Sequence, residues 1–185
     1  MIRLATPRLL LRDLTLADAP GILALDSNPD VLRYVPNRLI STLAEAEAII
    51  RYIRQQYERN GIGRWAVVRQ DTQEFIGWCG LKLVNDSEVN SRINYHDIGY
   101  RLLPPHWGQG FASEAAHATL HHGLEVLQLP EINATVMQEN TASRRILEKL
   151  GMQPQEEFLE PDGSLWWWYA RQNPMQKTAL GRSKN

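Results

Sequence analysis

Cysteine, long apolar runs and an excess of charge of either sign are all scarce in this 185-residue sequence. The single cysteine, Cys79, cannot close an internal disulfide, which suits a protein of a reducing compartment. A helix that crosses a bilayer needs about 20 consecutive apolar residues, and no run here approaches that length. Arg3, Arg8 and Arg12 interrupt the apolar residues near the amino terminus. We therefore expect neither a signal peptide nor a membrane span, and a cytoplasmic location.

The charge balance excludes any general attraction to nucleic acid or to an anionic membrane. Twenty Lys and Arg residues stand against 21 Asp and Glu residues, so binding to either partner would need a local basic patch. The one basic segment is short and lies at residues 174–185, which we expect to form a mobile tail. Residues 1–173 suffice for one domain with a sizeable core.

The spacing of apolar residues predicts a single α+β domain. Strands are predicted at residues 8–14, 65–68, 74–84, 94–103, 132–137, 158–159 and 164–171. Helices are predicted from residue 15 or 18 to 25, and at 30–34, 42–61, 112–127 and 140–150. Turns around residues 71–72 and 161–163 predict two hairpins, whereas the strand, helix and strand from residue 95 to 137 predict a parallel pair. We therefore expect a mixed, mostly antiparallel sheet flanked by helices.

The stretch W-G-Q-G-F-A-S-E at residues 107–114 joins a predicted strand to a predicted helix. Two glycines two residues apart allow the backbone to approach a ligand closely. The helix start adds unpaired N–H groups and a partial positive charge. The stretch therefore predicts a phosphate site. It is not the dinucleotide fingerprint, which would need glycine in place of Ser113.

Four motifs in order carry a resemblance to a known family. They are T-P-R-L-L-L-R at residues 6–12, D-I-G-Y-R-L at 97–102, W-G-Q-G-F-A-S-E-A at 107–115, and N-T-A-S-R at 140–144 followed by E-K-L-G-M at 148–152. Together they resemble the GNAT superfamily of acetyl-CoA-dependent N-acetyltransferases, in its RimJ/RimL-like branch. The resemblance implies a GNAT domain over residues 1–173, in which a splayed parallel strand pair holds acetyl-CoA as co-substrate and no metal takes part.

The resemblance also implies which residues hold the coenzyme. Backbone N–H groups of the glycine turn would bind the pyrophosphate, strand residues would offer backbone groups to the pantetheine arm, and Arg144 or Arg145 would reach a phosphate. The implied set is Leu102, Leu103, Trp107, Gly108, Gln109, Gly110, Phe111, Ala112, Ser113, Asn140, Ser143 and Arg144. The general family pattern has Gln or Arg where Trp107 stands. For Asn140 and Ser143, helix capping is the alternative, and for Arg144 it is a solvated helix face.

Two residues are candidates for proton transfer. Asp97 matches a carboxylate that takes a proton from the amine in some family members, directly or through water. Its alternative is a structural charge, either in an ion pair with Arg101, on the same face of the predicted strand, or at the rim of the site. Ser143 matches a position near the thiol, where a hydroxyl could protonate the departing thiolate. The acceptor that the branch implies is the N-terminal α-amine of a protein.

Other reactive residues favour structural interpretations. Cys79 lies in an apolar run and is predicted to be a core residue rather than a nucleophile. His117 and His121 are one helical turn apart, but no third ligand accompanies them. Trp166, Trp167 and Trp168 are predicted to pack in a strand that alternates between the two faces of the sheet.

Alternatives to α-amine acetylation remain open at this stage. The acceptor could be a small-molecule amine such as an antibiotic, a polyamine or a metabolite. The chain could also be a silent acetyl-CoA-binding module, or an interaction protein that docks through the tryptophan run. We expect a monomer or homodimer that binds neither nucleic acid nor membrane.

Overall fold

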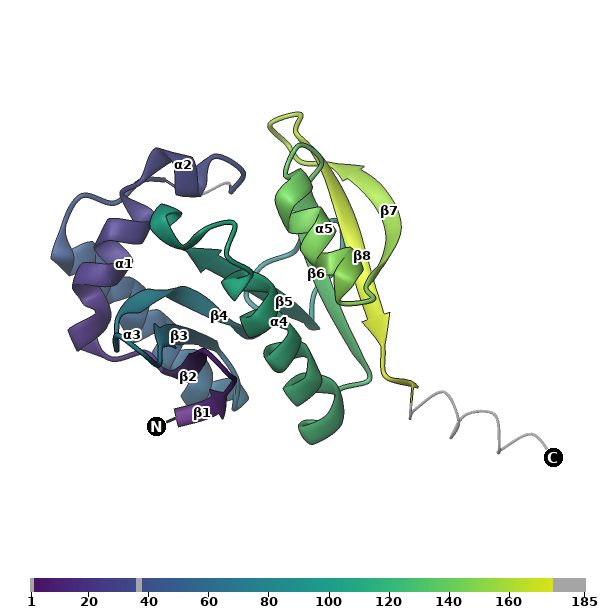
Figure 1. The fold of residues 1–185 in the computed structure, drawn as a ribbon. Coiled ribbons are helices and arrows are strands. Elements are labelled where there is room, and N and C mark those ends of the chain that lie inside the picture. Colours follow the sequence, from purple (N-terminus) through teal and green to yellow (C-terminus); the bar gives the residue numbers. More distant parts are fainter. Residues whose placement is uncertain (1, 36–37, 175–185) are drawn as a thin grey trace.

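The computed structural model describes residues 2–35 and 38–174, and shows one eight-stranded sheet with the strand order β1-β2-β3-β4-β5-β6-β8-β7 (Figure 1). The strands are β1 (Ile2–Ala5), β2 (Leu9–Asp13), β3 (Arg64–Arg69), β4 (Phe75–Val84), β5 (Tyr95–Leu102), β6 (Glu131–Met137), β7 (Gln153–Leu159) and β8 (Leu165–Gln172). The helices are α1 (Ala19–Asp26), α2 (Pro29–Leu32), α3 (Leu43–Asn60), α4 (Phe111–His121) and α5 (Thr141–Lys149), with single turns at Leu16–Asp18, Pro104–His106 and His122–Val126. The predicted tail lies outside the described residues from residue 175 onward.

Every neighbouring strand pair is antiparallel except β5 and β6. These two run parallel and share a single pair of partners, Asp97 and Asn133. The strands β1–β5 and the strands β6–β8 therefore form two halves that diverge beyond this point (Figure 1). The α+β class, the mixed sheet and the splayed parallel pair predicted from sequence are confirmed.

A buried asparagine fastens the sheet where its two halves meet. Asn133 is 2% exposed; its amide nitrogen donates to the His96 carbonyl at 3.4 Å, and its Oδ1 accepts from the Trp168 indole at 2.9 Å. A buried polar group is stabilising only when its hydrogen bonds are made. Because Asn133 contacts both β5 and β8, it fixes the residue at which the gap between the halves begins.

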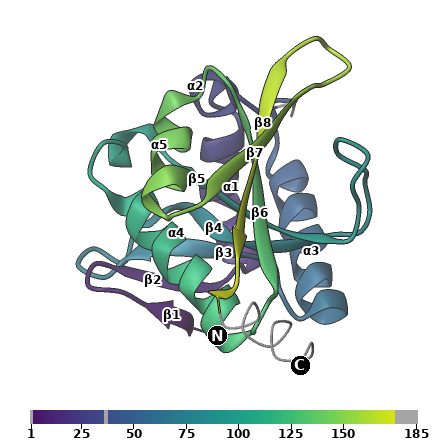
Figure 2. The same ribbon diagram turned by 90° about the vertical axis from the view of Figure 1, so that its right-hand side faces the viewer.

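The sheet is covered on both faces. Trp65 and Val67 of β3 pack in the core that includes Phe111, Ala115 and Leu120 of α4, and Ala66 and Val68 pack in the core that includes residues of α1 and α3. Successive strand side chains point to opposite faces, which explains why four consecutive residues of β3 are buried. Figure 2 shows α4 and α3 on opposite sides of the sheet.

The helix predicted at residues 42–61 is confirmed as α3. Thr42 and Glu45 form a capping box at its start, and Gly61 ends the helix with φ of 71°. Ala46, Ile50 and Ile53 are its buried apolar residues. Both predicted hairpins also form, β3 with β4 and β7 with β8. None of the helices in the described part of the chain is long and apolar enough to cross a bilayer.

Two edge strands differ from the sequence prediction. β1 was not predicted, and β7 begins at Gln153, five residues before the predicted strand at 158–159. Most of β7 is exposed, so it has no apolar alternation to reveal it. Pro154 is tolerated because an edge strand can spare a backbone donor.

We predict that Gly80 is needed for close packing of β3 on β4. A Cβ atom at Gly80 would lie 2.6 Å from the Gly63 carbonyl oxygen and 2.8 Å from Arg64 Cα, and backbone atoms cannot yield as side-chain ends do. Gly80→Ala should lower the free energy of unfolding by about 2 kcal/mol, measured by urea denaturation. The control Gly61→Ala meets no atom within 4 Å and bears only the left-handed strain of about 1 kcal/mol. Equal losses in both variants would contradict this account.

Candidate active site

The glycine turn opens α4 with an unobstructed set of backbone donors. Gly108 and Gly110 have φ of 71° and 81°, a region that only glycine enters at no steric cost. The first helical bond runs from the Glu114 N–H to the Gly110 carbonyl at 3.0 Å, and no side chain caps the helix. The N–H groups of residues 111–113 therefore lack intrahelical partners. A Cβ atom at Gly108 would meet nothing within 4 Å, so the turn has room for a phosphate group.

An arginine from the amino-terminal segment lies beside this turn. Arg8 Nε contacts Glu114 Oε2 at 2.6 Å, its Nη1 donates to the Gln109 carbonyl at 3.0 Å, and its Cζ lies 4.4 Å from the Phe111 ring centroid. Thr6 Oγ1 donates to Glu114 Oε1 at 2.6 Å. Burial acts to raise the pKa of Glu114, but the bonds from Thr6 and Arg8 outweigh it and lower that pKa. Sequence reasoning missed Arg8 because its partners are about 100 residues away.

Beyond Asp97 the edge of β5 that faces β6 is open. The Leu103 N–H donates to the Ile76 carbonyl at 2.9 Å, on the β4 side. Backbone groups alternate between the two edges of a strand, so the N–H groups of Tyr100 and Leu102 face the gap. The Leu102 carbonyl accepts from the Trp107 indole at 2.7 Å. The Leu103 N–H is therefore used within the sheet, and the Trp107 side chain ties the glycine turn to the end of β5.

The start of α5 brings two hydroxyl groups together. Asn140 caps the helix by accepting the Ser143 N–H at 3.1 Å, which confirms the capping interpretation. Ser143 Oγ lies 2.9 Å from the Tyr100 hydroxyl, which also donates to the Ser143 carbonyl at 3.2 Å. Burial raises the pKa of Tyr100, so its hydroxyl keeps its proton at neutral pH. The pair links α5 to β5 across the gap.

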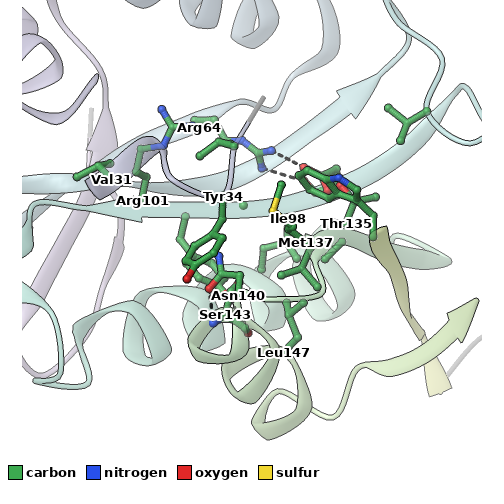
Figure 3. A pocket seen from close by; sticks show the side chains of 18 of the residues that line it. Val31, Tyr34, Arg64, Ile98, Arg101, Thr135, Met137, Asn140, Ser143 and Leu147 are labelled. Atoms are coloured by element: carbon green, nitrogen blue, oxygen red, sulfur yellow. Dashed lines mark hydrogen bonds and ion pairs between the residues drawn. The ribbon is translucent and has the colours of Figure 1, made fainter. Parts of the chain in front are cut away.

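A cavity of about 300 Å³ occupies the gap between the halves of the sheet (Figure 3). Its lining includes Tyr100, Asn140 and Ser143 from the side of α4 and α5, and Arg64 and Asp97 from the other face. Val31 and Tyr34, from α2 and the turn after it, also line it. The cavity therefore connects the two faces of the sheet at the point where β5 and β6 part.

Asp97 is paired with Arg64 and not with Arg101. Arg64 Nη2 contacts the Asp97 carboxylate, and Arg64 Nη1 donates to the Asp97 carbonyl at 3.0 Å. The sequence-based pairing with Arg101 is wrong because residues four apart in a strand are about 13 Å apart along it. Arg101 Nη1 instead contacts Asp26 Oδ1 at 2.5 Å. Burial raises the pKa of Asp97, although the Arg64 charge acts in the opposite direction.

A second carboxylate lines the cavity and was missed by sequence reasoning. Glu160 comes from the turn between β7 and β8, and no ion pair is recorded for it among the described residues. An acidic residue before a Pro-Asp-Gly turn gives no sequence signal of its own. Arg144 does not line the cavity. Its Nε donates to the Tyr169 hydroxyl at 3.4 Å, and its Cζ lies 5.4 Å from the Trp167 ring centroid.

The remaining reactive residues have structural surroundings. Cys79 is fully buried, and burial raises the pKa of its thiol to about 11, so the core assignment is confirmed. His117 and His121 are exposed, and residues 2–35 and 38–174 contain no cluster of three His, Cys, Asp or Glu side chains able to hold a metal. Trp166 and Trp168 are buried and Trp167 is half-buried, so the tryptophan run presents no exposed docking patch.

The chain matches a family model described as an acetyltransferase (GNAT) domain over residues 8–153. It is 37% identical over 151 residues to the uncharacterised N-acetyltransferase YoaA of Bacillus subtilis strain 168, a match that covers 81% of this chain and 82% of the relative.

Two solved structures share its fold at lower identity. RimL, a ribosomal-protein α-N-acetyltransferase in complex with coenzyme A, is 18% identical with a TM-score of 0.76, covering 93% of this chain and 98% of its own. Spermidine N-acetyltransferase from Vibrio cholerae, in complex with CoA and spermine, is 20% identical with a TM-score of 0.74. The match covers 91% of this chain and 97% of the spermidine N-acetyltransferase chain. These two likenesses show the fold alone, whereas the family model and YoaA show more: this chain belongs to the GNAT family and is an acetyl-CoA-dependent N-acetyltransferase.

Proposed function

We propose that the protein acetylates the N-terminal α-amine of a protein or peptide, as a RimJ/RimL-like enzyme of the cytoplasm. The observation that supports this most is the cavity between β5 and β6, because Ser143 of α5 and Asp97 of β5, which we propose for the two proton transfers, both line it. An amine can enter from the face of Arg64 and Asp97 while the coenzyme arm enters from the face of α4 and α5.

The glycine turn is proposed to bind the coenzyme's pyrophosphate. Its backbone donors, the N-terminus of α4 and the open space at Gly108 fit an anion. From there the open edge of β5 leads past Leu102 to Asn140, whose amide nitrogen has no partner recorded in the described part of the chain. These backbone and amide groups match the alternating amides of a pantetheine arm. We place Arg144 at the rim of this path, since its recorded contacts hold it against β8.

The α-amine is favoured as acceptor by its acidity. At pH 7 an α-amino group with a pKa near 8 requires about 1.4 kcal/mol to lose its proton, whereas a lysine with a pKa near 10.4 requires about 4.6 kcal/mol. A single carboxylate of moderate basicity is therefore a sufficient base for the α-amino group. A small-molecule amine is the second candidate, because a cavity of about 300 Å³ is at the lower limit of ordinary ligand sites.

The coenzyme supplies an activated acetyl thioester. In our proposal Asp97 accepts the proton that the amine loses on attack, directly or through water. Its pKa, raised by burial, makes it a stronger base than an exposed aspartate. Arg64 holds the carboxylate in place. Ser143 donates a proton to the departing sulfur, and solvent returns a proton to Ser143 after the products leave. The Tyr100 hydroxyl at 2.9 Å holds the Ser143 hydroxyl in place.

The coenzyme assignment predicts a selective loss in one glycine variant. Gly110→Asp would place a carboxylate where the pyrophosphate is proposed to bind, so KM for acetyl-CoA should rise at least tenfold, or about 1.4 kcal/mol of binding. Gly61→Asp is the matched control, since Gly61 has a similar φ of 71° but lies at the end of α3. Calorimetric titration of folded protein measures the affinity. Equal affinities in both variants would remove the turn from the coenzyme site.

The two proton-transfer roles predict different pH profiles. Asp97→Asn should lower kcat by about 10² to 10⁴, and the deficit should shrink as pH rises because more amine is then already deprotonated. Ser143→Ala should lower kcat less, because a coenzyme thiolate is a tolerable leaving group near neutral pH. Glu160→Gln is the comparison for Asp97→Asn. If Glu160→Gln loses activity and Asp97→Asn does not between about pH 6 and 9, Glu160 is the base and Asp97 is structural.

The acceptor itself is tested by a screen. Peptides with free N-termini and a library of small primary amines are incubated with the enzyme and acetyl-CoA, and released thiol is measured. We expect turnover with the peptides. Turnover confined to small amines would establish the second candidate, and tight coenzyme binding without any turnover would identify a silent module.

A further inference from the structure

We infer that the acceptor cavity selects a primary amine that carries one positive charge on a neutral, largely apolar body, and that it rejects amines with a carboxylate beside the amino group. The inference rests on the proposed function, since it concerns the acceptor of the same site. It follows from the arrangement of charge around the cavity, which no sequence motif encodes.

The cationic side chains in the described lining of the cavity are Arg64 and Arg101, and each is neutralised by its own aspartate. Arg64 pairs with Asp97, at side-chain exposures of 12% and 17%. Arg101 Nη1 lies 2.5 Å from Asp26 Oδ1, and the side chains of Arg101 and Asp26 are 10% and 9% exposed. Because water screens these groups poorly, each carboxylate cancels most of the attraction that its arginine could offer to another anion.

An aromatic ring holds both guanidinium groups in position. The Trp78 ring centroid lies 5.3 Å from Arg64 Cζ and 5.2 Å from Arg101 Cζ. Cation–π contacts of this kind are strongest where water is excluded. Neither arginine can turn toward a substrate carboxylate without losing both its aspartate and the ring. A neutral peptide carbonyl can accept from the unused N–H groups of Arg101, since a guanidinium has five, and unlike a carboxylate it adds no charge that competes with Asp26.

Glu160 gives the cavity an excess of negative charge. Arg64 is balanced by Asp97, and Arg101 is balanced by Asp26, which does not itself line the cavity. Glu160 lines the cavity and forms no ion pair among the described residues, so its charge remains in excess. One positive charge on the acceptor therefore balances the site. A carboxylate on the acceptor would add to the excess of negative charge instead.

The rest of the acceptor side is apolar. Its walls are formed by Val31, Tyr34, Val35, Val89, Met137 and Trp166. Burying a charge against such side chains is unfavourable unless it is paired, so the further ammonium groups of a polyamine gain nothing here. The charge pattern thus fits the N-terminus of a peptide that begins with neutral residues, in which the α-carboxylate has become an amide.

The test compares matched amines on the wild-type enzyme. Alanine amide and phenylalanine amide are compared with alanine and phenylalanine, and spermidine is included as a polycation. Rates are expressed per unprotonated amine, so that differences in amine pKa do not enter. We expect kcat/KM to be at least tenfold higher for each amide than for its free acid, and higher than for spermidine. If the free acids are turned over as well as the amides, the inference is overturned and the proposed function stands. If neither these amines nor the peptides of the screen are turned over, the inference and the proposed function are both overturned.

A variant that removes the counter-charge of one arginine tests whether the ion pairs cause the preference for amides over free acids. Asp26→Asn leaves Arg101 without its counter-charge, so the preference for phenylalanine amide over phenylalanine should fall about tenfold. Asp30→Asn is the matched control, because its partner Arg33 forms an exposed pair outside the cavity lining and the preference should not change.

Loss of the partner of a buried arginine destabilises a fold, so circular dichroism is recorded for each variant. Glu160→Gln provides a second route, since it removes the excess negative charge from an exposed turn and should also reduce the preference. An unchanged preference in Glu160→Gln and in folded Asp26→Asn would overturn the inference.

Discussion

The parting of β5 from β6 at Asn133 is the constraint on which the site depends. In a continuous sheet the backbone N–H and C=O groups of neighbouring strands pair along their whole length, which leaves no opening between the strands. Here the Asn133 side chain bonds to both neighbours at the last paired position, so the strands separate at a defined residue. Beyond it the β5 edge is unpaired, α5 covers the opening, and a cavity connects two faces that a continuous sheet would keep apart.

Buried charges gather on one side of the sheet, next to the point where β5 and β6 part. Arg64 comes from β3, Asp97 and Arg101 from β5 and Asp26 from the end of α1, and Trp78 of β4 lies between the two pairs. Ion pairs that are mostly removed from water contribute little net stability because desolvation offsets their attraction. Arg64, Asp97 and Arg101 line the cavity, which indicates a role in shaping its electric field, and the pair of Arg101 with Asp26 links α1 to β5.

Local signals in the sequence predicted most of the fold, and non-local contacts account for what was missed. The capping box of α3, the glycine turn before α4 and the Asn140 cap of α5 depend on residues three or four apart, so their spacing is visible in the chain. The edge strand β7 lacks apolar alternation. The pairing of Asp97 with Arg64 depends on strand order, and alternation alone suggested the wrong partner, Arg101. Glu160 belongs to no motif, and Arg8 lies in the T-P-R-L-L-L-R motif but about 100 residues from its partners, so only the folded chain brings the two to the site.

The attachment of the amino-terminal segment to α4 has a consequence for how the protein is made. Glu114 receives bonds from Thr6 and Arg8, the latter across a sequence separation of 106 residues. During synthesis the first hairpin emerges from the ribosome long before its partner on α4 exists. The glycine turn therefore acquires its Arg8 neighbour only after more than half of the chain has been translated. Contacts of such long range form slowly, so the surroundings of the glycine turn are completed late. An extension fused ahead of Thr6 would therefore lie close to this turn, although it is far from it in sequence.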